Sequence, residues 1–219
     1  MAGRRNHGSP ADLVAAARAF GVAGERVLAA LAGTRREQFL PPDLAALAYL
    51  DQPVPIGDGQ VTTQPSLTAI MIDALGLAGT ERVLEVGSGH GYQTALLARL
   101  AQQVISVEIR PPLAAAARQH LAAAGVPNAD VITADGSEGW PAAAPYDAVL
   151  VSAAFPAVPA PLAAQLTEGG RLVQPVGPGG REDVRLFTRR GGRLVLMRSL
   201  VPASFVPLLG RYGYPAQGR

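Results

Sequence analysis

Helical and extended hydrophobic patterns alternate along most of the chain. From Leu67 to Leu75 apolar residues recur at intervals of three and four, which predicts an amphipathic helix starting at Pro65. Short apolar runs rich in valine and isoleucine follow, each separated from the next by a helical pattern. The runs predict strands at 82–86, 103–109, 129–133, 146–152 and 170–176, and the patterns between them predict helices at 91–101, 113–125 and 159–167.

This alternation is typical of an α/β protein. It predicts a Rossmann-like, mostly parallel and twisted sheet with helices on both faces. Two more β runs, at 183–189 and 193–200, are joined around Arg190 and two glycines, which predicts a β-hairpin at the C-terminal end.

The N-terminal part has a different character. Residues 1–10 form a predicted flexible tail, and two short helices are predicted at 11–20 and 24–32. The segment 41–65 is rich in proline and glycine and predicts a long loop, the kind of segment that often carries functional residues. We expect one domain over 11–219, in which 11–64 lies on the substrate side and 65–219 forms the α/β core.

Two residue types are absent from the sequence, and their absence excludes several kinds of catalytic and metal-binding site. The 219 residues include no cysteine and no lysine, which excludes disulfides, thiolate metal sites, cysteine nucleophiles and Schiff bases. The three histidines, His7, His90 and His120, are too dispersed to predict a metal site. We therefore expect no metal.

The charge and hydropathy of the sequence limit the kinds of binding partner that we expect. The net charge is only +2, and no basic stripe is interleaved with aromatic residues, so we expect no nucleic-acid partner. The uncharged stretch 148–167 has the length of a membrane span but contains three prolines, so we expect no membrane association. No targeting segment is visible either, and a cytoplasmic location is expected.

A glycine-rich loop follows the first predicted strand of the core, in the sequence VLEVGSGHGY at 83–92. Gly87, Ser88, Gly89 and Gly91 give a G-x-G-x-G pattern, whose third glycine comes one residue too early for the dinucleotide fingerprint. Glu85 would repel a pyrophosphate but could accept hydrogen bonds from an ammonium group. The loop therefore favours S-adenosyl-L-methionine over a dinucleotide.

Two more acids lie at the ends of the next strands, where ligands of such sheets bind. Glu108 is placed to accept hydrogen bonds from both hydroxyls of a ribose, and Asp135, followed by Gly136, could accept from an adenine amino group. An acid at one strand end is often only solvated. Three acids at successive strand ends beside a glycine loop predict a site for S-adenosyl-L-methionine.

Several blocks of sequence resemble the protein-L-isoaspartate O-methyltransferase family, from about Val14 to Leu209. The blocks are RREQFLP (35–41), AYLDQPVPIGDGQ (48–60), VLEVGSGHGYQTALLA (83–98), DGSEGWPAAAPYDAVLVSAA (135–154), QLTEGGRLVQPVG (165–177) and FVPLLG (205–210). The glycine loop alone indicates only a class I S-adenosylmethionine-dependent methyltransferase, whereas the later blocks are more specific.

The resemblance implies an activity. Family members methylate the free α-carboxylate of L-isoaspartyl residues in damaged proteins, and leave S-adenosyl-L-homocysteine. The ester then collapses to a succinimide, which returns some normal aspartate on each cycle. The resemblance also implies a monomer.

The resemblance also implies substrate-side residues. Thr63 takes the place of a serine in the family pattern, and we expect its hydroxyl to orient the substrate, with Thr62 as the substitute if the loop shifts by one residue. Ser66 is expected near the substrate or cofactor, and Phe205 and Val206 are expected to offer backbone hydrogen bonds to an extended peptide. Alternatively, Thr63 only leads into the following helix, and 205–206 is an ordinary edge strand.

Two other functions stay open at this level. The first is methylation of an aspartate in one dedicated peptide during its maturation. The second is a non-catalytic protein that binds S-adenosyl-L-methionine.

Overall fold

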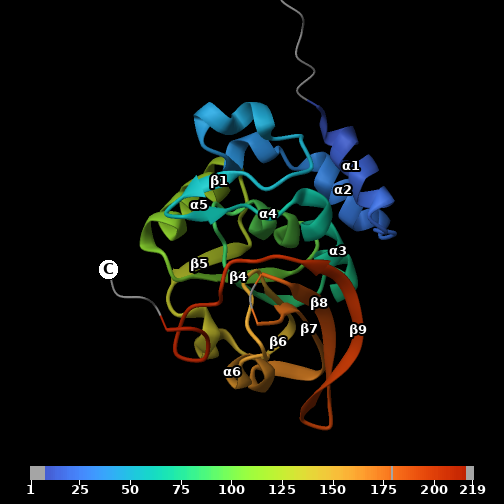
Figure 1. Ribbon diagram of the computed structural model, residues 1–219, viewed down its shortest axis with the longest axis vertical. Coiled ribbons are helices and arrows are strands. Elements are labelled where there is room, and N and C mark those ends of the chain that lie inside the picture. Colours follow the sequence, from blue (N-terminus) through green and yellow to red (C-terminus); the bar gives the residue numbers. More distant parts are fainter. Residues whose placement is uncertain (1–7, 179, 216–219) are drawn as a thin grey trace, which may run out of the picture.

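A computed structural model describes residues 8–178 and 180–215, and its centre is a seven-stranded sheet (Figure 1). The strands are β1 (Pro55–Gly57), β2 (Gln60–Val61), β3 (Arg82–Val86), β4 (Gln103–Glu108), β5 (Ala129–Thr133), β6 (Tyr146–Val151), β7 (Leu166–Val176), β8 (Glu182–Arg190) and β9 (Arg193–Ala203). The α-helices are α1 (Pro10–Ala19), α2 (Glu25–Gly33), α3 (Pro65–Leu75), α4 (Tyr92–Ala98), α5 (Pro111–Ala123) and α6 (Ala160–Ala164). Four 3₁₀ turns complete the list: η1 (Arg36–Phe39), η2 (Pro42–Leu47), η3 (Gly136–Glu138) and η4 (Pro141–Ala143).

The large sheet has the order β5-β4-β3-β6-β7-β8-β9. The first five strands in this order, β5, β4, β3, β6 and β7, run parallel, and β8 and β9 add an antiparallel hairpin at one edge. The chain builds outward from β3 through β4 and β5, and then returns to the other side of β3 with β6. This reversal makes the carboxyl ends of β3, β4 and β6 the expected place for a ligand. The predicted fold class is confirmed.

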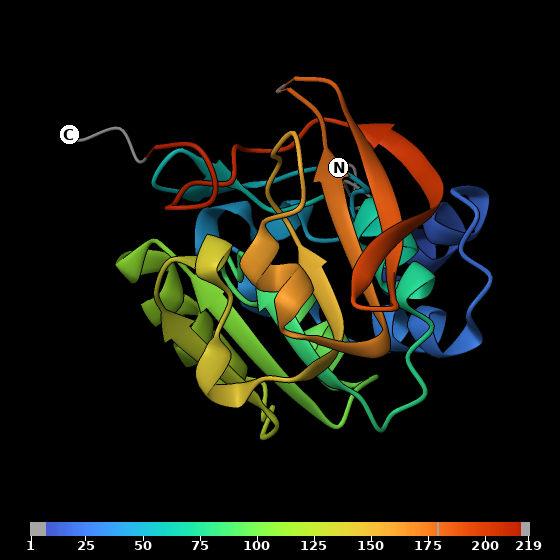
Figure 2. The same ribbon diagram turned by 90° about the horizontal axis from the view of Figure 1, so that it is seen from below.

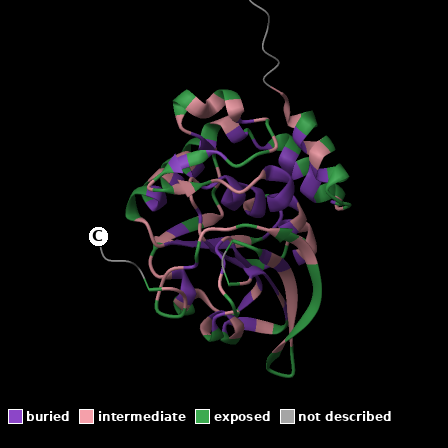
Figure 3. Cartoon of the chain, in the orientation of Figure 1, coloured by how far each residue is buried: buried purple, intermediate pink, exposed green. Residues whose placement is uncertain are grey.

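Side chains of β3 alternate between two cores. Val83 packs with α1 to α5 on one face, whereas Leu84 and Val86 pack with α6 on the other face (Figure 2). Helices thus cover both faces, but unequally: within the described residues, five α-helices pack on the first face, whereas α6 and 3₁₀ turns pack on the second. Figure 3 shows the sheet interior buried and the tip of the β8–β9 hairpin exposed.

The N-terminal helices share the core of the sheet. Leu31 of α2 is fully buried in the same cluster as Val83. Helix α1 begins at Pro10, with Ser9 as its N-cap, so the predicted tail of residues 1–10 is too long at its C-terminal end. The rest of that tail, residues 1–7, lies outside the described residues.

One predicted helix is substantially wrong. The expected helix at 159–167 is only α6, and β7 begins at Leu166 rather than at residue 170. Gln165 ends the helix because its side chain accepts from Trp140 N at 2.9 Å and donates to Glu138 O at 2.8 Å. These bonds hold it at the junction between helix and strand.

The predicted long loop 41–65 contains regular pieces. It includes η2 and the two short antiparallel strands β1 and β2, which form a hairpin over α4 and α5 (Figure 1). No helix in the described part of the chain is long and apolar enough to cross a membrane.

Candidate active site

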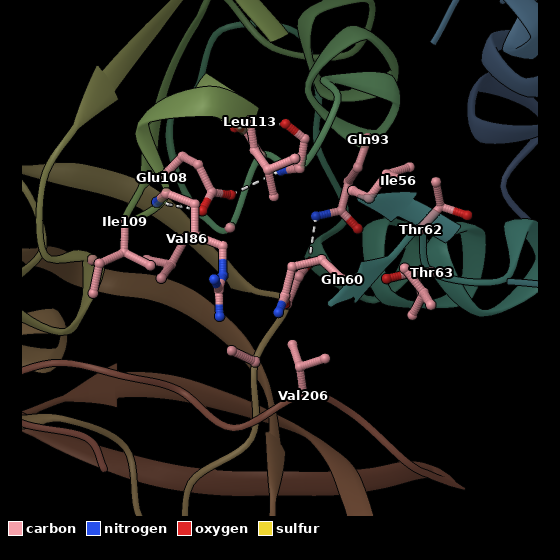
Figure 4. A pocket seen from close by; sticks show the side chains of 18 of the residues that line it. Ile56, Gln60, Thr62, Thr63, Val86, Gln93, Glu108, Ile109, Leu113 and Val206 are labelled. Atoms are coloured by element: carbon pink, nitrogen blue, oxygen red, sulfur yellow. Dashed lines mark hydrogen bonds between the residues drawn. The ribbon is translucent and has the colours of Figure 1, made fainter. Parts of the chain in front are cut away.

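A cavity of about 130 Å³ opens at the carboxyl ends of β3, β4 and β6 (Figure 4). The glycine loop after β3 forms one wall. The β1–β2 hairpin with residues 62–63 and the segment 206–209 form the facing wall. The cavity therefore lies where the sheet topology predicts a ligand.

Three of the four predicted loop residues reach the cavity. Gly87, Ser88 and Gly89 line it, and a Cβ added at Gly89 would lie 3.0 Å from Ile56 Cδ1. Gly91 does not line the cavity. Its absent side chain instead allows α5 to approach, since an added Cβ would lie 3.3 Å from Leu121 Cγ.

Glu108 is the acid that the structure places in the cavity wall. Its side chain accepts from Gly89 N and Arg110 N, each at 3.0 Å. Burial raises the pKa of the Glu108 carboxyl, and those two backbone N–H groups partly oppose the shift. A buried acceptor that is fixed in this way can take hydrogen bonds from a pair of ligand hydroxyls.

Glu85 lies under the cavity rather than in its wall. The carboxylate is fully buried and accepts from Gln93 Nε2 at 2.9 Å, Ser106 Oγ at 2.6 Å and Thr94 Oγ1 at 2.5 Å. Burial raises its pKa, and the same three donors oppose that shift. The prediction that Glu85 receives an ammonium group directly is therefore corrected, because its position on β3 turns it toward α4.

Asp135 is not among the residues that line the cavity, whereas its neighbour Gly136 is. Asp135 Oδ1 accepts from Ser137 N and Ser137 Oγ at 2.9 and 2.6 Å, and Oδ2 accepts from Arg211 N at 2.7 Å. The prediction that Asp135 binds an adenine amino group is not supported by this arrangement, because Oδ1 is engaged by Ser137 and Oδ2 by the backbone of Arg211.

Thr62 and Thr63 both line the cavity but face opposite ways. Figure 4 shows the Thr63 oxygen turned toward the cavity and the Thr62 oxygen turned away from it. Thr62 Oγ1 accepts from Arg36 Nη2 at 2.9 Å and from Val54 N at 3.0 Å. The Thr63 hydroxyl has no hydrogen-bond partner among the described residues, so of the two it is the group available to a ligand.

Of the other residues predicted on the substrate side, Val206 lines the cavity, whereas Ser66 and Phe205 do not. Ser66 is fully buried at the start of α3, where its N–H donates to Asp51 Oδ1 at 2.8 Å, and it does not line the cavity. Val206 lines the cavity, and its carbonyl accepts from Ala154 N at 2.8 Å. The Phe205 N–H donates to Glu182 Oε2 at 3.0 Å. Within the described residues this leaves the Phe205 C=O and the Val206 N–H for an extended peptide.

The sequence reasoning missed several polar cavity residues, among them Ser152 and Gln93. Ser152 directly follows β6, so the rule that placed Glu108 at a strand end could have found it. Gln93, in the first turn of α4, carries no such signal. Gln93 Nε2 donates to Glu85 and, at 2.7 Å, to Ser152 Oγ, while Gln93 Oε1 is buried without a partner.

The donor and acceptor pattern fits S-adenosyl-L-methionine. The wall around the glycine loop offers mainly acceptors, the Glu108 carboxylate and the orphaned Gln93 Oε1, which suit a ligand rich in O–H and N–H donors. Glu85 and Glu108 also give this region negative charge, which suits a cationic ligand. No cluster of metal-ligating side chains occurs within residues 8–178 and 180–215.

Comparisons with known proteins agree with the fold. A family profile described as "Protein-L-isoaspartate(D-aspartate) O-methyltransferase (PCMT)" matches residues 9–213. A protein-L-isoaspartate O-methyltransferase of Anaeromyxobacter dehalogenans is 53% identical over 191 residues, which cover 86% of this chain and 91% of that protein. The one from Methanoculleus marisnigri is 47% identical over 200 residues, with 91% and 90% covered.

Solved structures show the same architecture. A protein-L-isoaspartate O-methyltransferase superposes with a TM-score of 0.81 at 28% identity, over 93% of this chain and 67% of that one. A Plasmodium falciparum structure, solved in complex with S-adenosyl-L-homocysteine, gives a TM-score of 0.77 at 20% identity, over 90% and 96%, which shows the fold alone. With a family match across most of its length, this chain belongs to the protein-L-isoaspartate O-methyltransferase family.

Proposed function

We propose that this protein transfers the methyl group of S-adenosyl-L-methionine to the free α-carboxylate of L-isoaspartyl residues in damaged proteins and peptides. The observation that carries the proposal is one cavity with two unlike walls. We call the glycine loop with Glu108, Gln93 and Gly136 the cofactor side, and residues 56–63 with 206–209 the substrate side.

The cofactor side holds S-adenosyl-L-methionine and orients its methyl group. The cofactor supplies a methyl group on a sulfonium, which is electrophilic without help from an acid. The Glu108 carboxylate accepts from the ribose hydroxyls, and the Gln93 amide oxygen, held by Glu85 and Ser152, accepts from an N–H donor at the other end. Gly89 and Gly136 leave room for close approach along the wall.

The substrate side aligns a nucleophile that needs no general base. A peptide α-carboxylate with a pKa of roughly 3.5 is ionised at neutral pH, so what remains for the protein is alignment and exclusion of water. The free hydroxyl of Thr63 donates to that carboxylate. The Phe205 C=O and Val206 N–H pair with the backbone on either side of the isoaspartyl residue.

A peptide pair tests the proposal. Labelled S-adenosyl-L-methionine is offered with a short isoaspartyl peptide and, separately, with its normal aspartyl twin. We expect label only in the isoaspartyl peptide, as a base-labile ester. Label in neither peptide, with S-adenosyl-L-homocysteine binding intact, would contradict the proposal and favour a dedicated peptide substrate or a non-catalytic binder.

The setting of the activity is also part of the proposal. We infer a cytoplasmic, monomeric enzyme whose partners are isoaspartyl-containing proteins, with no nucleic acid and no membrane involved. The near-neutral net charge of +2 supports the absence of a nucleic-acid partner, because a protein that binds a polyanion usually carries a strong positive charge.

A further inference from the structure

Arg36, in η1, is a buried cation whose hydrogen bonds all go to neutral groups. Its side chain is fully buried, and no carboxylate lies within ion-pair distance of it in the described part of the chain. Nη1 donates to Ala48 O at 3.1 Å and Leu50 O at 3.0 Å, while Nη2 donates to Gln52 O at 3.0 Å and Thr62 Oγ1 at 2.9 Å. Burying a guanidinium is costly, so these four acceptors mark a specific arrangement of segment 48–62.

Asp51 supplies a second anchor on the same segment. Its Oδ2 accepts from Gln64 Nε2 at 2.8 Å, and its Oδ1 accepts from Ser66 N at 2.8 Å. Gln64 makes no capping bond of its own to α3, so Asp51 takes the place of a local cap. The chain is therefore held at Thr62 by Arg36 and at Gln64 by Asp51.

Thr63 lies between these two anchors. The side chains of residues 62 and 64 are fixed by Arg36 and Asp51, which limits the directions open to the side chain between them. Figure 4 shows this outcome, with the Thr63 oxygen facing the cavity. The direction of the Thr63 hydroxyl is thus decided by bonds that its neighbours make.

The anchor is also tied to the cofactor side. The Arg36 guanidinium carbon lies 5.6 Å from the ring centroid of Tyr92, the first residue of α4, directly after the glycine loop. Phe39, on the next turn of η1, packs on the same ring with centroids 5.9 Å apart. Residues 36–39 therefore contact both the substrate side, through Thr62, and the start of α4 beside the cofactor side, through Tyr92.

We propose that Arg36 is a positioning residue, which acts through Thr62 and together with the Asp51–Gln64 anchor to aim the Thr63 hydroxyl at the substrate carboxylate. This rests on the role of Thr63 in the proposed function. It accounts for a feature that the reaction itself does not require, a buried arginine that forms no ion pair within the described residues. Arg36 itself touches neither substrate nor cofactor.

Thr62→Val replaces one atom and removes the acceptor shared by Arg36 Nη2 and Val54 N, which tests the anchor at Thr62. We expect kcat/KM on an isoaspartyl peptide to fall roughly 10-fold, while the Kd for S-adenosyl-L-homocysteine stays within about twofold. Thr62→Ser keeps the acceptor and should restore most of the activity. Thr34→Val is the matched control, because Thr34 is buried and its hydroxyl makes one bond, to Ala30 O at 2.8 Å, outside the cavity. Its activity should match wild type.

A double-mutant cycle separates positioning from a general structural effect. If Thr62 acts by aiming Thr63, Thr62→Val should cause no further loss in a Thr63→Ala background. Additive losses, or full activity of Thr62→Val alone, would overturn the inference. Should Thr63→Ala itself be fully active, the Thr63 role fails and the inference with it, although methyl transfer to isoaspartyl peptides would still stand.

A second variant covers the case in which Thr62→Val does not fold, as judged by circular dichroism. Gln64→Leu removes the other anchor, and the same inference predicts a loss of kcat/KM that also disappears in the Thr63→Ala background. A loss that persists in that background would contradict the account.

Discussion

The cofactor side of the cavity is carried by the ends of regular elements, whereas the substrate side is carried by irregular segments. Gly87 and Glu108 follow or end central strands, and Gln93 lies in the first turn of a helix. Thr63 belongs to no helix or strand, and its neighbours Thr62 and Gln64 are held by Arg36 and Asp51, which lie 27 and 12 residues before Thr63 in the chain. The sheet places the residues of the cofactor side, whereas hydrogen bonds of single side chains place those of the substrate side.

This difference predicts how each side of the cavity responds to the loss of a side chain. Removing one side chain from the cofactor side should weaken a ligand contact and leave the sheet intact. Removing one from the substrate side should disturb a whole segment. Four predictions, from the largest expected effect to the smallest, test whether the two sides can be separated in this way.

Arg36→Met should lower the free energy of unfolding by about 3 kcal/mol, because several buried acceptors lose their donor at once. Urea denaturation measures this. Arg99→Met is the matched control: Arg99 makes one exposed bond, to Gly33 O at 2.8 Å, and its loss should cost less than about 1 kcal/mol. Equal losses in the two variants would show that segment 48–62 does not depend on Arg36.

Glu108→Gln should weaken S-adenosyl-L-homocysteine binding roughly 100-fold, since charge-assisted bonds to two hydroxyls are lost at once. Isothermal titration calorimetry measures the Kd. Asp135→Asn provides the comparison, because the structure engages Asp135 with Ser137 and Arg211 rather than with the cavity. A larger loss of affinity in Asp135→Asn than in Glu108→Gln would reverse the assignment made here.

Acid should weaken cofactor binding through Glu108. Only the ionised carboxylate accepts from both hydroxyls, and burial raises its pKa above the ordinary 4.5. Affinity for S-adenosyl-L-homocysteine should therefore be complete well above the raised pKa, and decline as pH falls toward it, before an exposed carboxyl would protonate. Titrations across this range should show the decline in wild type and a flat profile in Glu108→Gln. A decline of the same size in the variant would assign it to another group.

The smallest effect concerns the ion pair that joins the two sides. Arg110 Nη1 donates to Asp58 Oδ2 at 2.7 Å, which fastens the β1–β2 hairpin to the end of β4. Because both side chains are partly exposed, Asp58→Asn should speed S-adenosyl-L-homocysteine release only about two- to fivefold. Stopped-flow measurements should show that salt speeds release from wild type more than from the variant. Equal salt dependence would mean that this pair does not hold the hairpin.

Sequence reasoning was sufficient for most of the cofactor side. The β-α alternation placed Glu108 at a strand end, and the glycine pattern placed Gly87 and Gly89 in the wall. Sequence reasoning was wrong about Glu85, although the alternation of side chains along β3 could have shown this. Glu85 lies on the same face of β3 as Val83, which points into the core under α4. The bonding of Asp135 was not predicted, because two of its partners, Ser137 N and Arg211 N, are backbone groups without a sequence signal.

The substrate side was less accessible to sequence. The resemblance pointed to Thr63, but only the hydrogen bonds of Thr62 separate the roles of the two threonines. Arg36 stood in RREQFLP as one of two adjacent arginines, and its exposed neighbour Arg35 pairs with Glu37 at 2.8 Å. Three of the four bonds from Arg36 go to carbonyl oxygens, which every residue type has. Such a role leaves no pattern in the letters of a single sequence.

The most direct test of the division between the two sides is Thr63→Ala, measured for both methyl transfer and cofactor binding. The account predicts that kcat/KM on an isoaspartyl peptide falls roughly 10- to 100-fold, the loss of a hydrogen bond to a charged group, while the Kd for S-adenosyl-L-homocysteine changes less than about twofold. Thr63→Ser should keep most of the activity. A parallel loss of both quantities in Thr63→Ala, or no loss of transfer, would contradict the account.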